Sequence, residues 1–271
     1  KNSLYIAIGV VLFYILYFNL SSKSDFPTKP LLFNDLKIND QGLYKLNLED
    51  ESLFSGTVFK YINSDSMQSY KSDEIIISNG SVVKTKSFNQ QGNCLNEYRY
   101  IDSLKNDTIK EWYPNGNLKL IKTYSLGILD GIYQTWYENG IMKEHKYYKA
   151  GKNDSIWIEW YENGNKVYEK QYISNNRHGK WITYFNNSQI EEVREYDNGK
   201  RIGTWEKYLY EGQRIYTRTY KNGRKEGVWH EWWKNGELKN EATYTKDKKW
   251  GKFSEWQRNG KLLWEGHYKN N

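Results

Sequence analysis

The sequence has little cysteine, proline or histidine, with one, three and four of these among 271 residues. The single thiol, Cys94, excludes a disulfide within the chain, and it excludes a cysteine-based zinc site, which needs more than one thiolate. Aromatic residues are abundant instead, at 17% of the chain. This composition is typical of a β-meander held by ring packing, so the stability must come from stacking.

The charge is positive, at +7 with a pI near 9.0. A positive balance favours anionic surfaces or partners, although this excess is modest for a chain of this length. Neither a nucleic-acid-binding motif nor a basic tail accompanies it. Nucleic acid is therefore not expected as a partner.

A hairpin signal recurs along the chain every 24 residues. In the stretch 131–148, two β-prone runs are joined at Asn139-Gly140, a pair that tolerates the positive φ angles of a tight hairpin turn. The tyrosine that closes the second strand recurs without insertion or deletion at Tyr100, Tyr124, Tyr148, Tyr172, Tyr196, Tyr220, Tyr244 and Tyr268. Several columns share this frame, so the chain is a tandem array of β-hairpins.

Glycines follow the same frame at two positions. One lies in the hairpin turn at Gly116, Gly140, Gly164, Gly212, Gly236 and Gly260, with Ser188 in its place once. The other comes two residues before an aromatic residue at Gly131, Gly179, Gly203, Gly227 and Gly251, with Ser155 in its place once. Glycine at fixed points of a repeat indicates turns and close backbone approaches rather than a phosphate-binding loop.

An apolar and aromatic run occupies residues 4–20, with Lys1 before it and Lys23 after it. As a helix it would span roughly 25 Å, slightly less than a ~30 Å hydrocarbon core. We therefore predict a transmembrane or signal helix in residues 1–20. No Ala-x-Ala pattern follows, which favours an uncleaved membrane anchor with the repeats on the extracytoplasmic side. If the segment is cleaved, the protein is secreted or periplasmic.

The remaining chain divides into three predicted parts. Residues 21–50 are polar, contain Pro27 and Pro30, and form a linker. Residues 51–99 are degenerate capping repeats, in which only Phe88 and Gly92 keep the frame. An atypical terminal unit is expected where a stack of repeats must close its open end. Residues 100–271 are the regular repeats.

The regular repeats resemble a known family. They read Tyr-x-x-Gly-x-x-x-Gly-x-Trp-x-x-Trp-Tyr-x-Asn-Gly, nearly whole at 124–140 and 220–236. This pattern is similar to the MORN repeat, and most closely to the bacterial variant in YwqK-type proteins, which are described as antitoxins. The resemblance implies an all-β fold, an elongated single-layer antiparallel β-meander. It also implies a protein that binds other molecules and catalyses nothing.

Two aromatic columns are candidate structural residues. The first column holds Tyr133, Trp157, Trp181, Trp205, Trp229 and Phe253, and the second holds Trp112, Trp136, Trp160, Tyr184, Tyr208, Trp232 and Trp256. Strict alternation places the two columns on opposite faces unless a bulge intervenes. Packing of the ribbon is the simpler role for stacked rings. Binding of glycans or choline-like cations is a weaker alternative.

One basic column is the candidate binding site, with Lys122, Lys146, Lys170, Arg194 and Arg218, and it ends where Ala242 and Gly266 take its place. These charges recur roughly every 10 Å along one face. The simpler interpretation is a solubilising stripe paired across strands with glutamates such as Glu159, Glu169 and Glu231. The functional hypothesis is a strip for an acidic partner or anionic head groups.

Catalytic and metal-binding patterns are not found. The four histidines, His145, His178, His230 and His267, occupy four different positions of the repeat, and none has a metal-ligand spacing. No nucleophile elbow is present either. We therefore expect no catalytic residues, no metal and no cofactor.

The sequence thus predicts a membrane-anchored, non-enzymatic repeat scaffold. Its expected partner is another protein, acidic or toxin-like, as for YwqK-type antitoxin or immunity proteins. The alternative is an envelope protein that holds anionic lipid or cell-wall polymer on a basic face.

Overall fold

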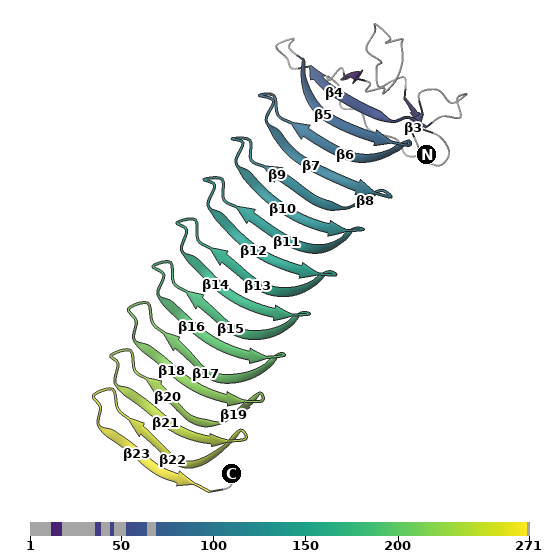
Figure 1. The fold of residues 1–271 in the computed structure, drawn as a ribbon. Helices are drawn as coiled ribbons and strands as arrows, with labels where there is room; N and C mark the ends of the chain where they lie inside the picture. Colours follow the sequence, from purple (N-terminus) through teal and green to yellow (C-terminus); the bar gives the residue numbers. More distant parts are fainter. Residues whose placement is uncertain (1–11, 18–35, 39–43, 46–52, 64–68, 270–271) are drawn as a thin grey trace, which may run out of the picture. The chain divides into compact units, whose positions relative to one another are not determined.

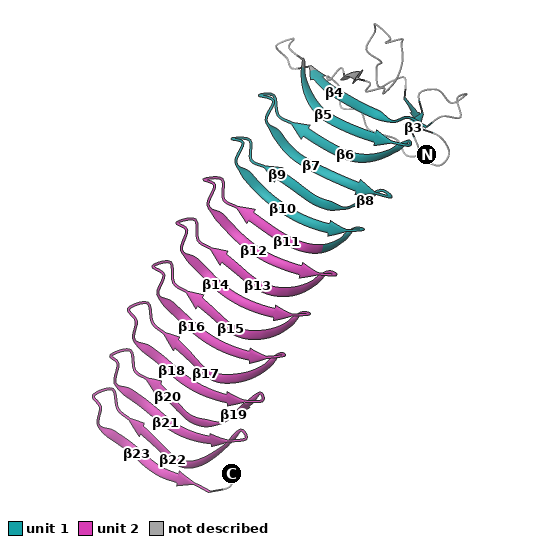
Figure 2. Cartoon of the chain, in the orientation of Figure 1, with its two compact units in different colours: residues 1–129 teal, residues 130–271 magenta. Residues whose placement is uncertain are grey.

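The computed structural model describes residues 12–17, 36–38, 44–45, 53–63 and 69–269, and every regular element in these ranges is a β-strand (Figure 1). All the strand pairs within each unit are antiparallel, as predicted for a meander of tandem hairpins. The chain divides into two compact units, residues 1–129 and residues 130–271 (Figure 2).

Unit 1 contains the strands before the regular repeats and the first of those repeats. Strand β4 pairs with β1 and with β5, and strands β5, β6 and β7 each pair with the next. Strand β7 pairs with both β8 and β9, and β9 pairs with β10. Strands β2 and β3 form a small sheet of their own. The strands are β1 (Leu12–Tyr17), β2 (Lys37–Ile38), β3 (Tyr44–Lys45), β4 (Gly56–Asn63), β5 (Ser69–Ser78), β6 (Ser81–Phe88), β7 (Cys94–Ile101), β8 (Leu104–Lys105), β9 (Asp107–Trp112) and β10 (Leu118–Ser125).

The apolar run at 4–20 is not confirmed as a helix, because most of it lies outside the described residues. The part that is described, Leu12–Tyr17, forms strand β1, with Leu12 opposite Ile62 and Tyr17 opposite Thr57. Aromatic and β-branched residues suit a strand as well as an apolar helix. In the described ranges there is no helix with the length and hydropathy to cross a bilayer.

An apolar core lies at the beginning of unit 1. Leu36, Phe54, Val58 and Ile77 are buried, with Val58 at 0% exposure, and Tyr44 packs against them. Backbone hydrogen bonds tie this core together, since the Tyr44 N–H donates to the Gly80 carbonyl oxygen at 2.8 Å and the Phe54 N–H to that of Tyr44 at 2.9 Å. Burying each large apolar side chain stabilises by about 1.5–3 kcal/mol. Residues that precede the repeats therefore cover this sheet with apolar side chains.

Unit 2 is a run of hairpins in which each strand pairs with the next. Strand β18 pairs with both β19 and β20, because Glu226 separates these two short strands. The strands are β11 (Ile128–Trp136), β12 (Met142–Lys149), β13 (Lys152–Trp160), β14 (Lys166–Ile173), β15 (Asn176–Tyr184), β16 (Ile190–Asp197), β17 (Lys200–Tyr208), β18 (Arg214–Lys221), β19 (Arg224–Lys225), β20 (Gly227–Trp232), β21 (Leu238–Thr245), β22 (Lys248–Trp256) and β23 (Leu262–Tyr268).

The turns between repeats have the two positive φ angles that an Asn-Gly pair predicts, whereas at Asn139-Gly140 only Gly140 is left-handed, with a φ of 85°. Asn198 and Gly199 have φ angles of 45° and 83°, the pair of positive values that a two-residue hairpin turn requires. At the other end of the hairpins the turn glycine is also left-handed, and Ser188, which replaces it once, adopts a φ of 69°. The Asn139 side chain accepts from the Ile141 N–H at 3.0 Å and donates to the Glu162 carbonyl oxygen at 3.3 Å. The first bond lies within the turn, and the second ties the turn to that of the next repeat.

The Gly-x-Trp pattern corresponds to a bulge between repeats. Val193 on strand β16 pairs with Glu206 on β17, and Glu195 pairs with Ile202. One residue, Arg194, therefore lies between these pairs on β16, whereas three residues, 203–205, lie between them on β17. Gly203 has a φ of +63°, and a Cβ there would overlap the Glu195 carboxylate. Glycine is thus favoured at this position because the left-handed backbone and the close neighbour both disfavour a side chain.

Candidate interaction face

One face of unit 2 carries a continuous ladder of aromatic rings. The first aromatic column and the closing tyrosines alternate along it, because each tyrosine is opposite the residue two before the column's ring, as Tyr196 is opposite Gly179 and Tyr172 is opposite Ser155. Neighbouring centroids lie 4.8–6.2 Å apart in the order Tyr133, Tyr148, Trp157, Tyr172, Trp181, Tyr196, Trp205, Tyr220, Trp229 and Tyr244. Each contact of this kind contributes about 0.5–1.5 kcal/mol beyond burial.

The indole rings are held in place by their own N–H groups. The Trp181 Nε1–H donates to the Gln171 carbonyl oxygen at 2.9 Å, and that of Trp205 donates to the Glu195 carbonyl oxygen at 3.2 Å. Both acceptors lie on the preceding strand, so each indole leans across the bulge toward the tyrosine of the previous repeat. The bond satisfies the polar atom of a partly buried ring and fixes its orientation.

The basic column predicted from the sequence lies on this face and is partly neutralised there. We call it the first basic column. Lys146 contacts Glu144 at 2.5 Å, Arg194 contacts Glu192 at 2.6 Å, and Arg218 contacts Glu231 at 2.8 Å. Only the last of these glutamates was among the predicted partners, and the other two lie two residues before their partner on the same strand. Lys122, the member in unit 1, is opposite Ile109 on β9.

Lys170 differs from the other members of this column in unit 2. Its ammonium lies 3.6 Å from the ring centroid of Tyr168. Burial lowers the pKa of Lys170, and the positive charges of Lys146, Arg177 and Arg194 lower it further, against the attraction of Glu159. The cation is thus held by a ring more than by a carboxylate.

A second basic column, which the sequence analysis missed, lies beside the ladder. Its members Arg177, Arg201, Lys225 and Lys249 recur every 24 residues, and each lies over two rings. The Lys225 ammonium, for example, is 4.6 Å from the centroid of Trp229 and 4.9 Å from that of Tyr244. Within the described ranges, none of the four forms an ion pair with a carboxylate. This column therefore presents uncompensated positive charge.

A pocket opens where Ala242 takes the place of a basic residue. Ala242 is opposite Trp229 on one side and Phe253 on the other, and it is only 5% exposed. The cavity of about 540 Å³ is lined by these rings and by Tyr244, together with the cations Arg218, Lys225 and Lys249. Glu231, the carboxylate in the lining, is already paired with Arg218. The pocket, which we call the Ala242 pocket, thus combines aromatic walls with net positive charge.

The second aromatic column lies on the opposite face. The bulge near the end of this hairpin lies on β16, where Glu191 has no partner on β15. Strand β15 therefore alternates regularly from Trp181 to Tyr184, and these two rings, three residues apart, point to opposite sides. On that face the Tyr184 hydroxyl donates to the Glu169 carboxylate at 3.1 Å. The ladder and both basic columns of unit 2 therefore share one face, which we call the aromatic–basic face.

The histidines of unit 2 have separate structural partners. His145 bonds the Gln134 side chain at 2.9 Å, and His230 bonds the Glu241 carboxylate at 3.1 Å. Among the residues that the structure describes, no three His, Cys, Asp or Glu side chains gather where they could hold a metal ion.

The arrangement of cations and rings on the aromatic–basic face is suited to binding anions.

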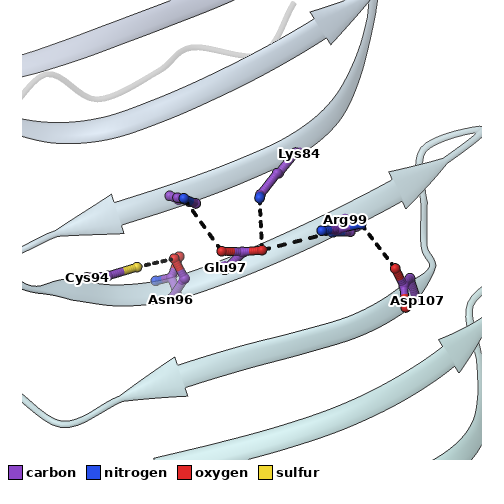
Figure 3. A network of polar contacts seen from close by, with 7 residues as sticks. Lys84, Cys94, Asn96, Glu97, Arg99 and Asp107 are labelled. Atoms are coloured by element: carbon purple, nitrogen blue, oxygen red, sulfur yellow. Dashed lines mark hydrogen bonds and ion pairs between the residues drawn. The ribbon is translucent and has the colours of Figure 1, made fainter. Parts of the chain in front are cut away.

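Unit 1 has a compact polar network of its own (Figure 3). Glu97 lies 2.9 Å from Lys84 and 3.9 Å from Arg99, which in turn contacts Asp107 at 3.2 Å. Burial opposes ionisation of Glu97, but the hydrogen bond and charge of Lys84 outweigh it and hold the pKa of Glu97 below its usual value. The Cys94 thiol, whose pKa is raised by burial, donates to the Asn96 carbonyl oxygen at 3.3 Å. These contacts link strands β6, β7 and β9, so the network supports the sheet.

These features define a class of protein, the β-hairpin repeat proteins that present a periodic aromatic and basic face. The MORN repeat variant matches residues 108–125, 129–150, 153–174, 177–198 and 225–246, so the repeat array belongs to the MORN repeat family. The unmatched stretches at 199–224 and 247–269 keep the same frame. No curated protein matches the chain by sequence. MORN repeats typically mediate interactions with proteins or membrane lipids and are typically non-catalytic.

Proposed function

We propose that this protein is a non-catalytic scaffold that binds an acidic protein partner through the aromatic–basic face of unit 2. The observation that carries the proposal is the second basic column, four cations that rings hold in place and no carboxylate neutralises. An arginine or lysine over an aromatic ring is pre-positioned, so less side-chain entropy is lost when an anion binds. Repetition adds avidity, because each further contact forms within the same complex.

The first basic column is a weaker candidate for this role. Its members next to Glu144, Glu192 and Glu231 already interact with a negative charge on the same face. A partner would have to displace that carboxylate, which offsets much of the gain. The two columns thus provide a matched comparison, since they lie on neighbouring strands of the same face and both recur every 24 residues.

The test compares two triple variants of the full chain in binding to poly-glutamate at low salt. We expect Arg177→Gln, Arg201→Gln and Lys225→Gln together to weaken binding by on the order of 100-fold, because three uncompensated charges are lost. The control with Lys146→Gln, Lys170→Gln and Arg194→Gln should weaken it by less than about tenfold. Thermal melts of both variants show whether the fold is retained.

Vesicles that contain phosphatidylglycerol distinguish protein from lipid as the partner. Binding to the vesicles without binding to poly-glutamate would favour the envelope alternative and overturn the protein-partner proposal. Equal loss in the two triple variants would overturn the assignment to the second basic column. A complex that persists at high salt would show that buried rings, rather than charges, carry the interface.

We propose further that the protein is an immunity or antitoxin-like scaffold held at a membrane by residues 1–20. The apolar run at 4–20 and the resemblance to YwqK-type proteins support this, and Lys1 favours repeats on the extracytoplasmic side. In membrane fractions, the full chain should resist alkaline carbonate extraction, and a variant that lacks residues 1–20 should be soluble. Extraction of the full chain by carbonate would contradict the anchor.

A further inference from the structure

We infer that the aromatic–basic face binds its partner as a polyproline II segment with an acidic residue at every third position, which ends in the Ala242 pocket. This inference rests on the proposed function and adds the form of the ligand to it. It depends on the spacing of the second basic column, on the direction of side chains in extended chains, and on the cavity at Ala242.

The spacing of the cations sets the spacing of the carboxylates. Successive members of the second basic column are two strands apart, which is roughly 9.6 Å at 4.8 Å per strand. Three residues of a polyproline II helix span about 9.3 Å, and three residues of a β-strand span about 9.9 Å. Two residues span only about 6.6 Å, so a ligand with that spacing would lose register within one repeat.

The direction of the side chains selects between the two extended forms. In a β-strand, residues three apart point to opposite sides, so half of the carboxylates would face away from the protein. A polyproline II helix has three residues per turn, so residues three apart point to the same side. Such segments also dock on aromatic-lined surfaces at low entropic cost, since the helix is already formed in the free ligand. The ladder of alternating tryptophan and tyrosine rings offers such a surface.

The Ala242 pocket marks one end of the bound segment. In the preceding repeat the guanidinium of Arg218 lies 5.3 Å from the Trp229 centroid and covers that ring, whereas the methyl group of Ala242 leaves the cavity open. A cation could in principle take the empty place over the rings. Lys225 and Lys249 both line the cavity without a carboxylate partner, however, and they already lie over its rings, so a further cation would be repelled by two charges. An anionic group is therefore the favoured occupant.

The first experiment varies the spacing of the charges at constant composition. One peptide contains four Glu-Pro-Pro repeats, and its control has the same glutamates and prolines with the glutamates at every second position. Isothermal titration of the full chain at low salt should show at least about tenfold tighter binding of the first peptide. Equal affinity would overturn the inference while leaving the proposed function intact. Failure of both peptides and of poly-glutamate would overturn the proposed function as well.

The second experiment fills the pocket. Ala242→Arg gives this repeat the basic residue that the first basic column carries in the other repeats. Glu255 lies 13 residues after position 242, as Glu231 lies 13 residues after its partner Arg218. The new arginine thus has a carboxylate partner, and the variant should fold. We expect a loss of about tenfold in affinity for the Glu-Pro-Pro peptide, although the variant is more positive. The control Thr243→Arg adds the same charge on the opposite face and should not weaken binding. If Ala242→Arg binds as tightly as Thr243→Arg, the pocket is not part of the site.

Discussion

Trp205→Ala is expected to lower the free energy of unfolding by about 3 kcal/mol, near the lower end of values for removing a large aromatic side chain. The Trp205 ring lies 5.2 Å from that of Tyr196 and 4.8 Å from that of Tyr220, so alanine removes both contacts at once. It also leaves the Glu195 carbonyl oxygen without its indole donor. Chemical denaturation followed by circular dichroism measures the loss.

The shape of the transition provides a second readout of the same variant. In a repeat array each unit contacts only its neighbours, so stability is close to a sum of repeat and interface terms. Trp205 lies in the middle of the ladder, and its removal should divide one cooperative transition into two. Trp205→Phe keeps a ring between the two tyrosines and should recover roughly half of the stability.

Tyr208→Ala is the matched control for Trp205→Ala. Tyr208 lies three residues further along the same strand, on the opposite face, where its hydroxyl donates to the Glu206 carboxylate at 3.0 Å. We expect this variant to cost about 1–2 kcal/mol and to keep a single transition. If it destabilises as much as Trp205→Ala and also splits the transition, the ladder is not the specific source of cooperativity.

The repeat and its turns could be predicted from the sequence because they depend on local conformation. Asn198-Gly199 requires no distant partner to adopt its two positive φ angles, and a frame of 24 residues repeats them. The same frame predicts the hairpins and the two aromatic columns. The second basic column follows the same frame. It was missed because Arg177 and Lys225 lie beside turns, where a charged residue is ordinarily a solvated surface residue.

The pairing of charges could not be predicted, because it depends on the bulges. Strict alternation across strands suggests partners such as Glu159 for the first basic column, whereas Lys146 pairs with Glu144 on its own strand. The inserted residues of each Gly-x-Trp bulge shift the register between repeats by an amount that alternation alone does not give. Which cations stay uncompensated follows from that shift. The predicted site residues therefore lie on the same face as the second basic column, which is less neutralised and was overlooked.

The apolar run at 4–20 illustrates a second limit of sequence patterns. A short apolar stretch suits a helix in a bilayer and a strand in a sheet equally well, and the choice depends on what covers it. In Leu12–Tyr17 the partner is strand β4, which lies far away in the sequence. Periodicity within the run carries no information about such a partner.

The stability of the protein is expected to fall steeply as the pH rises from about 10 to about 12. Burial, followed by the hydrogen bond to Glu192, raises the pKa of Tyr216 to about 12, and burial with the bond to Glu169 does the same for Tyr184. In unit 1, burial and Glu111 raise the pKa of Tyr98 to about 12. A tyrosine whose pKa is raised by folding contributes its full stability below the unfolded value near 10. That contribution is lost as the pH rises through the folded value.

The size of the alkaline loss can be bounded from these shifts. A shift of about two pKa units corresponds to roughly 2.7 kcal/mol, and partial solvent exposure reduces this to about 1–2 kcal/mol for each tyrosine. Three such residues give a loss of about 3–6 kcal/mol between neutral and strongly alkaline solution. Denaturant titrations across this pH range measure it. The tyrosinate absorbance band should show that some of the 25 tyrosines ionise only on unfolding.

Tyr216→Phe isolates one of these contributions. The variant loses the hydrogen bond to the buried Glu192, so it should be less stable than the parent at neutral pH by about 1 kcal/mol. It also has no hydroxyl to ionise, so its further loss between pH about 10 and 12 should be smaller than that of the parent by about 1–2 kcal/mol. The two stability curves should therefore converge as the pH rises. Curves that stay parallel throughout would show that the hydrogen bond between Tyr216 and Glu192 does not hold the tyrosine in its protonated form.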